Sequence, residues 1–261
     1  MMMFPLRTFS NEFRRSMSLW KAYQLDTISW MILWIIVFPL IIIMFDSISG
    51  GYDVSNRIDS LIGFLVWDLC MGVLTMTTTS IAEETQDGTL ENILISPITP
   101  TMLFSIRISV SFIRQAIQTL IVGIAIIIIL RLPLLELNFW SIVIIFLTVL
   151  GVGGVSLIFG GLALVYKNVS SAVNVISLLA LFFTGAIISL DSLGILFDAL
   201  KFLLPTAWGI DALRQSVVLG FVDETVILGL SIQAVLLVFA GAISFQWGFK
   251  RAQRQGSLGT Y

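Results

Sequence analysis

The stretch Ile81–Pro100, IAEETQDGTLENILISPITP, is the longest interruption of the apolar pattern in this chain. Asp87-Gly88 is a turn signal, and Thr89–Ser96 has the composition for about two helical turns. Pro97 ends that helix, because the residue before a proline is steered away from the α-helical region. The stretch therefore predicts a short helix inside a polar loop, with a new helix starting at Pro100.

The predicted short helix is amphipathic. Leu90, Ile93 and Leu94 fall on one face, and the acidic residues Glu84 and Glu91 flank it. It lies between two apolar runs that are each long enough to cross a membrane. Two interpretations follow: the apolar face docks on a partner protein, or the helix rests on lipid headgroups.

Composition places the chain among polytopic membrane proteins. Hydrophobic residues make up 57 % and charged residues only 11 %, whereas a soluble domain carries about 25 % charged residues. The chain has no His and a single Cys, Cys70, which excludes Ser-His and Cys-His catalysis, a His-ligated metal and a disulfide framework. It also has no phosphate-binding G-x-x-x-x-G-K-[ST] motif. We therefore expect a non-catalytic chain without cofactor, metal or nucleic acid, and any ATP must bind to another chain.

Residues 1–27 predict an amphipathic helix at the membrane interface rather than a signal peptide. At about 100° per residue its large apolar side chains share one sector of roughly 80°. These side chains are Leu6, Phe9, Phe13, Met17 and Trp20. Cations lie beside that sector, where they face anionic headgroups. The alternative is a soluble amphipathic helix that packs on a partner.

Residues 28–261 predict one all-α transmembrane domain with six spans, since each span needs about 20 mainly apolar residues. The expected spans are Ile28–Phe45, Leu61–Ile81, Pro100–Leu130, Phe139–Val165, Ala172–Leu190 and Thr225–Phe249. The third is longer than a bilayer requires, so we expect its first turns, which carry Arg107 and Arg114, to project into the cytosol or to snorkel. Glycines in the fourth span predict close helix packing, with a mobile, kinkable helix as the alternative.

The distribution of Lys and Arg predicts the orientation. With six spans, ten of the fourteen Lys and Arg residues lie on the side of the two termini. They are Arg7, Arg14, Arg15, Lys21, Arg107, Arg114, Lys167, Lys250, Arg251 and Arg254. The positive-inside rule then places both termini and the loop 82–99 in the cytoplasm.

Residues 191–220 are too apolar for a simple outer loop and too interrupted to span. The sequence predicts two short helices that are separated at Pro205. Together they would form a re-entrant hairpin that dips into the outer leaflet. Backbone of this kind is tolerated at membrane depth only where it packs against protein.

Two local motifs resemble the permeases of the ABC-2 type transporter family. The first is the order Glu84-x-x-Asp87-Gly88-Thr89-Leu90-Glu91-x-x-Leu94-x-Ser96-Pro97, and the second is Pro205 followed by Asp211-x-Leu213-Arg214 in the outer hairpin. The resemblance implies that 82–99 carries the coupling helix, which docks on an ATP-binding subunit. The implied coupling residues are Glu84, Gly88, Thr89, Leu90, Glu91, Ile93, Leu94, Ser96 and Pro97, and those of the outer hairpin are Pro205, Asp211 and Arg214.

The same resemblance implies the assembly and its activity. Two permease chains, identical or different, would combine with two ATP-binding subunits that hold ATP and Mg²⁺, in the plasma membrane. The implied activity is export of a drug-like, lipid or lipid-linked molecule. A polysaccharide or glycolipid exporter is the alternative, and an integral membrane enzyme is a more distant one.

Four residues are candidates for the substrate pathway. Asp68 lies deep in the second span, where a carboxylate faces protein or water rather than lipid. It could line a pathway, pair with Arg131 or Arg214, or make a structural hydrogen bond. Trp30, Trp34 and Phe38 form a stripe on the first span, which is typical either of a path for flat molecules or of packing and an interfacial anchor.

Overall fold

A computed structural model describes residues 3–49, 53–86, 99–166, 169–186 and 204–255 of this chain. The described residues form helices and connections, without a strand, which confirms the predicted all-α class. The helices are α1 (Met3–Ala22), α2 (Gln24–Ser49), α3 (Val54–Gln86), α5 (Pro100–Leu130), α6 (Phe139–Ala163), α7 (Val169–Phe183), α9 (Pro205–Leu219) and α10 (Glu224–Gln255).

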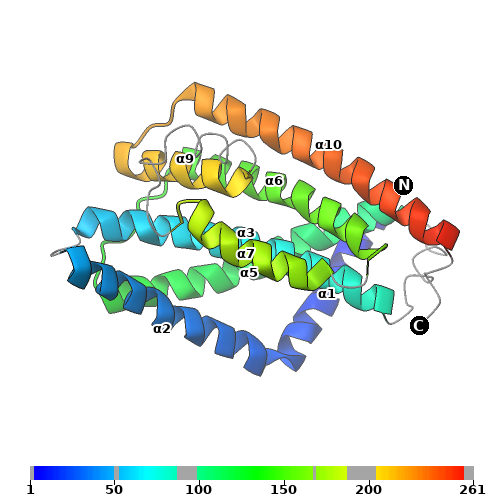
Figure 1. Ribbon diagram of the computed structural model, residues 1–261, viewed down its shortest axis with the longest axis horizontal. Helices are drawn as coiled ribbons and strands as arrows, with labels where there is room; N and C mark the ends of the chain where they lie inside the picture. Colours follow the sequence, from blue (N-terminus) through cyan, green and yellow to red (C-terminus); the bar gives the residue numbers. More distant parts are fainter. Residues whose placement is uncertain (1–2, 50–52, 87–98, 167–168, 187–203, 256–261) are drawn as a thin grey trace.

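The helices α2, α3, α5, α6, α7 and α10 run along one axis, and successive helices of this series alternate in direction (Figure 1). Figure 1 shows α1, the end of α3, the start of α5 and the end of α10 at one end of the bundle, which we call the terminal end. The end of α2, the start of α3 and the connection from α5 to α6 lie at the opposite end, together with the end of α9 and the start of α10. The alternation is the one that the predicted spans require.

Five of the helices are long and apolar enough to cross a membrane: α2, α3, α5, α6 and α10. The predicted third span coincides with α5, because Pro100 at the first helical position and Arg131 in the left-handed conformation mark its two ends. The N-terminal helix stops earlier than the predicted boundary at Thr27, since α1 ends at Ala22 and α2 begins at Gln24.

The predicted fifth span is wrong at its end. Its helix, α7, stops at Phe183 instead of continuing to Leu190, and Gly185 has a φ of 72°. A glycine in the left-handed region commonly terminates a helix. With 15 residues, α7 is shorter than a typical span, so six spans stay a prediction; residues 187–190 lie outside the described part.

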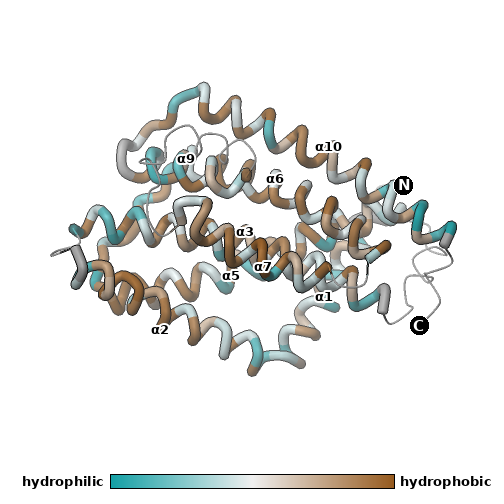
Figure 2. Tube along the Cα trace, viewed as in Figure 1, coloured by the Kyte–Doolittle hydropathy of each residue, from teal (hydrophilic) through white to brown (hydrophobic). Residues whose placement is uncertain are grey.

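Hydropathy follows the bundle axis. Figure 2 shows hydrophobic residues along the middle of the long helices, and hydrophilic residues mainly near their ends. Many large apolar side chains stay exposed on the outside of the bundle, for example Ile128 on α5 and Phe239 on α10. Exposed apolar surface of this extent is expected of a protein that faces lipid or other membrane subunits.

The second half of the predicted outer hairpin is α9 (Pro205–Leu219), and Gly220, in the left-handed conformation, follows its last residue. It packs against α6, α3 and α10, and Thr206, Ala207 and Ile210 are almost fully buried. The packing satisfies the condition that we expected for non-spanning backbone at membrane depth. The first predicted half-helix lies outside the described residues.

Glycines bring α6 and α10 into close contact. A Cβ at Gly154 would overlap the backbone of Leu237, and one at Gly161 would lie 2.8 Å from the carbonyl oxygen of Ser244. On the facing helix, Gly241 and Gly248 approach the backbone of the same two α6 glycines. The predicted close packing is confirmed, and it lies within the chain.

Two adjacent glycines of α6 provide a matched test of this packing. A Cβ at Gly153 would meet only Ile108 Cγ2, at 3.3 Å, whereas a Cβ at Gly154 meets backbone. Gly154→Ala should therefore reduce the free energy of unfolding by about 1–3 kcal/mol through overpacking. Gly153→Ala should leave it unchanged or raise it by up to about 1 kcal/mol, since Ala favours helix over Gly. Chemical unfolding in detergent micelles measures both, and equal effects would contradict the packing.

Candidate coupling site and polar sites of the bundle

The N-terminal helix is amphipathic, as predicted. Phe9 and Phe13 stack with ring centroids 6.4 Å apart, and both are partly buried. Arg7, Arg14 and Lys21 are exposed. The helix packs mainly on α5. One part of the surface of its apolar sector therefore contacts the bundle, and the other part stays exposed.

An ion-pair cluster joins α1, α3 and α5 at the terminal end. Arg107 of α5 lies at its centre: Nη1 donates to Glu84 Oε2 at 2.6 Å, and Nε donates to Glu12 Oε2 at 3.3 Å. Arg15 adds a second cation, 2.9 Å from Glu84 Oε1 and 3.7 Å from Glu12 Oε2. The cluster thus holds two arginines and two carboxylates, and their formal charges cancel.

The core of the cluster is buried. The side chains of Arg107 and Glu84 are only 9 % and 10 % exposed, and the Arg107 guanidinium lies over the Phe104 ring at 5.0 Å. The projection of the first turns of α5 beyond the membrane stays a prediction, and the Arg107 side chain itself is enclosed by protein. Its charge stays inside the fold because two carboxylates from other helices neutralise it. Arg114, the other cation of this expectation, is half-buried and approaches Thr27 Oγ1 at 3.5 Å.

Residues of the ion-pair cluster lie on both sides of the predicted coupling loop in the sequence. Glu84 lies in the last turn of α3, which ends at Gln86, and Arg107 lies two turns into α5, which begins at Pro100. Both helical ends next to the loop are thereby fixed to each other and to α1.

Most of the predicted coupling residues lie outside the described residues. These are Gly88, Thr89, Leu90, Glu91, Ile93, Leu94, Ser96 and Pro97. Glu84 is the one that the structure describes, and it forms ion pairs within the chain. Its role at the rim of a docking surface stays a prediction.

Asp68 faces protein rather than lipid, as predicted. It is 7 % exposed, and Thr119 Oγ1 donates a short hydrogen bond to its Oδ2. Gln115 Nε2 donates to the same oxygen at 3.1 Å and lies 3.3 Å from the Asp68 carbonyl oxygen. The hydrogen-bonded role is the one that the structure describes, and a role in transport stays a prediction.

The aromatic stripe of α2 divides into three environments. Phe38 is 1 % exposed and stacks on Phe64 of α3 at 4.5 Å. Trp34 contacts Phe64 and Trp67 at 5.3 and 5.1 Å, whereas Trp30 is 57 % exposed. Phe38 and Trp34 therefore join α2 to α3 by packing, and Trp30 is on the outside, where an interfacial anchor belongs.

Arg214 of the outer hairpin ties α9 to two other helices. Its Nε donates to the Asp59 carbonyl oxygen at 3.0 Å, and its Nη2 donates to the Gly185 carbonyl oxygen at 2.7 Å. It thereby satisfies a carbonyl just beyond the end of α7. Asp211, one helical turn before Arg214, is partly buried, and Pro205 provides the start of α9.

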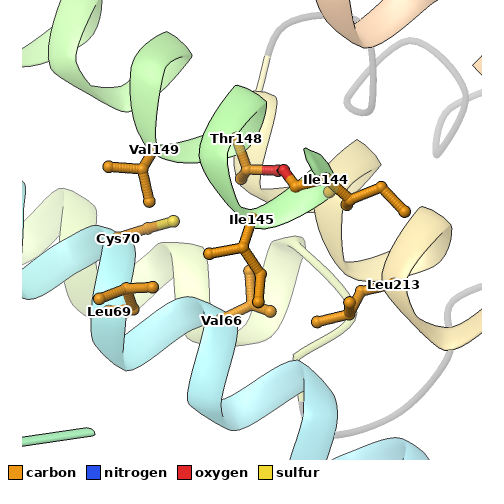
Figure 3. Close-up of a pocket in the computed structure, with 9 residues that line it drawn as sticks. Val66, Leu69, Cys70, Ile144, Ile145, Thr148, Val149 and Leu213 are labelled. Carbon is orange, nitrogen blue, oxygen red and sulfur yellow. The ribbon is translucent and has the colours of Figure 1, made fainter. Parts of the chain in front are cut away.

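One small cavity lies between α3, α6 and α9. Figure 3 shows Val66, Leu69 and Cys70 of α3 facing Ile145, Thr148 and Val149 of α6, with Leu213 of α9 beside them. Its volume of about 10 Å³ is close to the room that a single water molecule needs. The cavity is a packing defect rather than a substrate site, and the described residues contain no His, Cys, Asp and Glu group that could hold a metal.

Several residues of these sites were missed from the sequence. Glu12 and Arg15 look like ordinary polar positions of an amphipathic helix, and Gln115 and Thr119 look like isolated polar residues in a span. The available signal was that polar side chains inside an apolar run must find partners. Spacing along the chain gives no means to match Glu12 with Arg107, 95 residues away.

The burial of the cluster can be tested against a second ion pair of the same chemistry. Arg57 Nη2 lies 3.0 Å from Asp46 Oδ2, with 28 % and 34 % of the side chains exposed. Removing one partner of a buried pair costs about 3–5 kcal/mol, and an exposed pair is worth about 0–1 kcal/mol. Arg107→Gln should therefore lower the free energy of unfolding several times more than Arg57→Gln. Equal losses in chemical unfolding would contradict a buried, structural cluster.

Comparison with known families agrees with the fold. The family model for the ABC-2 type transporter matches residues 7–218, which is most of the chain and extends from α1 to α9. A comparison with curated proteins finds no match. The matched region includes the ion-pair cluster, Asp68 and the outer hairpin. The chain therefore belongs to the ABC-2 type transporter family and is a multi-pass membrane component of an ABC transporter.

Proposed function

We propose that this chain is the permease half of an ATP-driven exporter, and that the ion-pair cluster transmits motion of its coupling loop to the membrane helices. ATP and Mg²⁺ bind to two separate ATP-binding subunits, and two permease chains form the pathway. Closure of the ATP-binding subunits moves the coupling helix, and this motion shifts one permease half against the other. ATP thereby biases a two-state element, as in other ligand-driven domain movements.

The single observation that carries this proposal is the position of Arg107. It binds Glu84, just before the predicted coupling loop, and Glu12 of α1. A force on the loop therefore acts on α1, α3 and α5 together rather than on one flexible end. A helix that only rests on headgroups has no need of such a connection.

The distribution of charge supports an orientation with the terminal end in the cytoplasm of a plasma membrane. Exposed cations of α1 meet anionic headgroups there, and Arg57 and Arg131 lie at the opposite end. An ATP-binding subunit can reach the loop 82–99 only in this orientation.

The cargo that we propose is a drug-like, lipid or lipid-linked molecule, with a polysaccharide or glycolipid as the alternative. The exposed apolar faces of α2, α7 and α10 are available to lipid and to a second permease chain. An integral membrane enzyme has little support, because Arg107 and Glu84 are paired with each other, and Asp68 and Arg214 are hydrogen-bonded to neutral groups.

Docking of the coupling helix is tested by truncating its apolar face. Leu90→Ala/Leu94→Ala should still insert, yet lose the co-expressed ATP-binding subunit in a pull-down and lose transport. Each truncation removes methyl groups that the proposed interface would bury, and a loss of even about 1.4 kcal/mol lowers the affinity tenfold. Leu228→Ala/Leu236→Ala, at exposed positions of α10, is the matched control and should retain the subunit. Wild-type recovery of the subunit with wild-type transport by the first variant would exclude docking through this face.

Transmission through the cluster is tested separately from docking. Arg107→Gln should retain the ATP-binding subunit in the same pull-down, because the docking face is intact. Transport should fall at least about tenfold, which corresponds to 1.4 kcal/mol, since α1 and α3 no longer move with α5. Loss of the subunit would place Arg107 in docking, and unchanged transport would remove the cluster from the mechanism.

The orientation is tested by cysteine labelling in a Cys70→Ser background. Single cysteines at Gln86 and Asp53, which lie at opposite ends of the bundle, should react with an impermeant reagent from opposite sides of the membrane. Gln86 should react only in inside-out vesicles or after permeabilisation. Labelling of both positions from one side would contradict the topology.

A further inference from the structure

Asp68 has an unusual environment for an ionisable group. It lies 14 residues after the start of α3 and 18 before its end, about 20–27 Å from either end at 1.5 Å per residue. Its side chain reaches across to α5, where Thr119 and Gln115 both bind its Oδ2. Both partners are uncharged, and all three side chains are buried.

A close approach of the two helices encloses the group. A Cβ at Gly72, one turn after Asp68, would overlap the carboxamide of Gln115, so Gln115 occupies the space that a side chain would take. One turn before Asp68, Leu65 packs against Gly123 of α5. A Cβ added at Gly123 would lie 3.1 Å from Leu65 Cδ2. Asp68 therefore lies in the middle of a narrow seam between α3 and α5.

Within the described part of the chain, the neighbouring elements bring no cation to Asp68. The helices α6 and α7 contain no Asp, Glu, Lys or Arg. On α9, Arg214 binds the carbonyl oxygens of Asp59 and Gly185, and Asp211, the other charge of that helix, is an acid. No described Lys or Arg forms an ion pair with Asp68.

The remaining charges of α2, α3 and α5 are engaged elsewhere or lie near helix ends. On α5, Arg107 belongs to the ion-pair cluster and Arg114 points to Thr27 of α2. On α2, Asp26 and Asp46 lie near the two ends, and Asp46 pairs with Arg57 of α3. On α3 itself, Glu83 and Glu84 are in the last turn, and Cys70 is a buried neutral thiol two residues from Asp68.

We propose that Asp68 is a proton-binding site, which carries a proton while the seam between α3 and α5 is closed. Burying an isolated carboxylate in an apolar interior costs far more free energy than two hydrogen bonds from neutral groups contribute. Such a group therefore takes up a proton instead. A protonated carboxyl has one O–H to donate and still accepts hydrogen bonds, which suits the mixed donors and acceptors of Thr119 and Gln115. The seam widens locally at the depth of Asp68, 16 residues before Glu84, while the Arg107–Glu84 ion pair still joins α5 to the end of α3. Water then enters the seam, and the proton is released.

Infrared spectroscopy of the purified full-length chain, labelled with [4-¹³C]aspartate and held at pH 7 in lipid nanodiscs, tests the site directly. The wild type should show a labelled C=O stretch of a protonated carboxyl, and Asp68→Asn should lose it. Asp46→Asn is the matched control and should keep it, because Asp46 forms an ion pair with Arg57 near the end of α2. If Asp68→Asn fails to fold, Asp68→Glu serves instead, since it keeps a carboxyl at this position but removes the label.

Three outcomes would overturn the proposal. A wild type without the protonated band would mean that Asp68 is ionised. A band that persists in Asp68→Asn and in Asp68→Glu would belong to another aspartate. A labelled carboxylate band that moves when Na⁺ is replaced by choline would assign the compensating charge to a metal cation. None of these outcomes depends on the cargo or on the ATP-binding subunit, so the site can fail while the proposed function stands.

Discussion

Arg107 connects three parts of the chain that lie far apart in the sequence. Its guanidinium binds carboxylates from α1 and from the last turn of α3, and it belongs to the second turn of α5. A buried cation is tolerated only where opposite charge reaches it with good geometry. The positions of these three helices at the terminal end are therefore mutually dependent, and the loop between α3 and α5 begins and ends on a fixed base.

The same constraint explains two further polar contacts of the bundle. A membrane offers no water to a polar group, so a partner within the protein stabilises it. Asp68 is satisfied by Gln115 and Thr119 in the middle of the bundle. Near the opposite end, Asn138 of the α6 N-terminus binds the carbonyl oxygen of Ser216 at 3.0 Å. Polar contacts at three depths thus fix α3 to α5 and α9 to α6, while apolar surface remains for lipid and subunits.

Close contacts at glycines also join α6 to its neighbours. Gly154 and Gly161, on one face of α6, lie against the backbone of α10. Gly160, on another face, makes room for Ile81 of α3. On α9, Gly209 makes room for Thr148 of α6. These contacts leave no room for a Cβ at Gly154 or Gly161, so they determine how closely α6 and α10 pack. The contact between α3 and α5 also includes the polar side chains of Asp68, Gln115 and Thr119.

The sequence by itself determined the all-α membrane class, the limits of α5 and the amphipathic character of α1. These follow from composition, from apolar periodicity and from Pro100, none of which depends on how the helices pack. It also identified Asp68 as a residue that must face protein, because the cost of a charge in hydrocarbon does not depend on the fold. Only the tertiary structure decided that α7 stops at Phe183, that Arg107 is buried, and which residues surround Asp68. Ion pairs and helix seams join residues with no fixed spacing along the chain, so their partners become visible only when the helices are packed together.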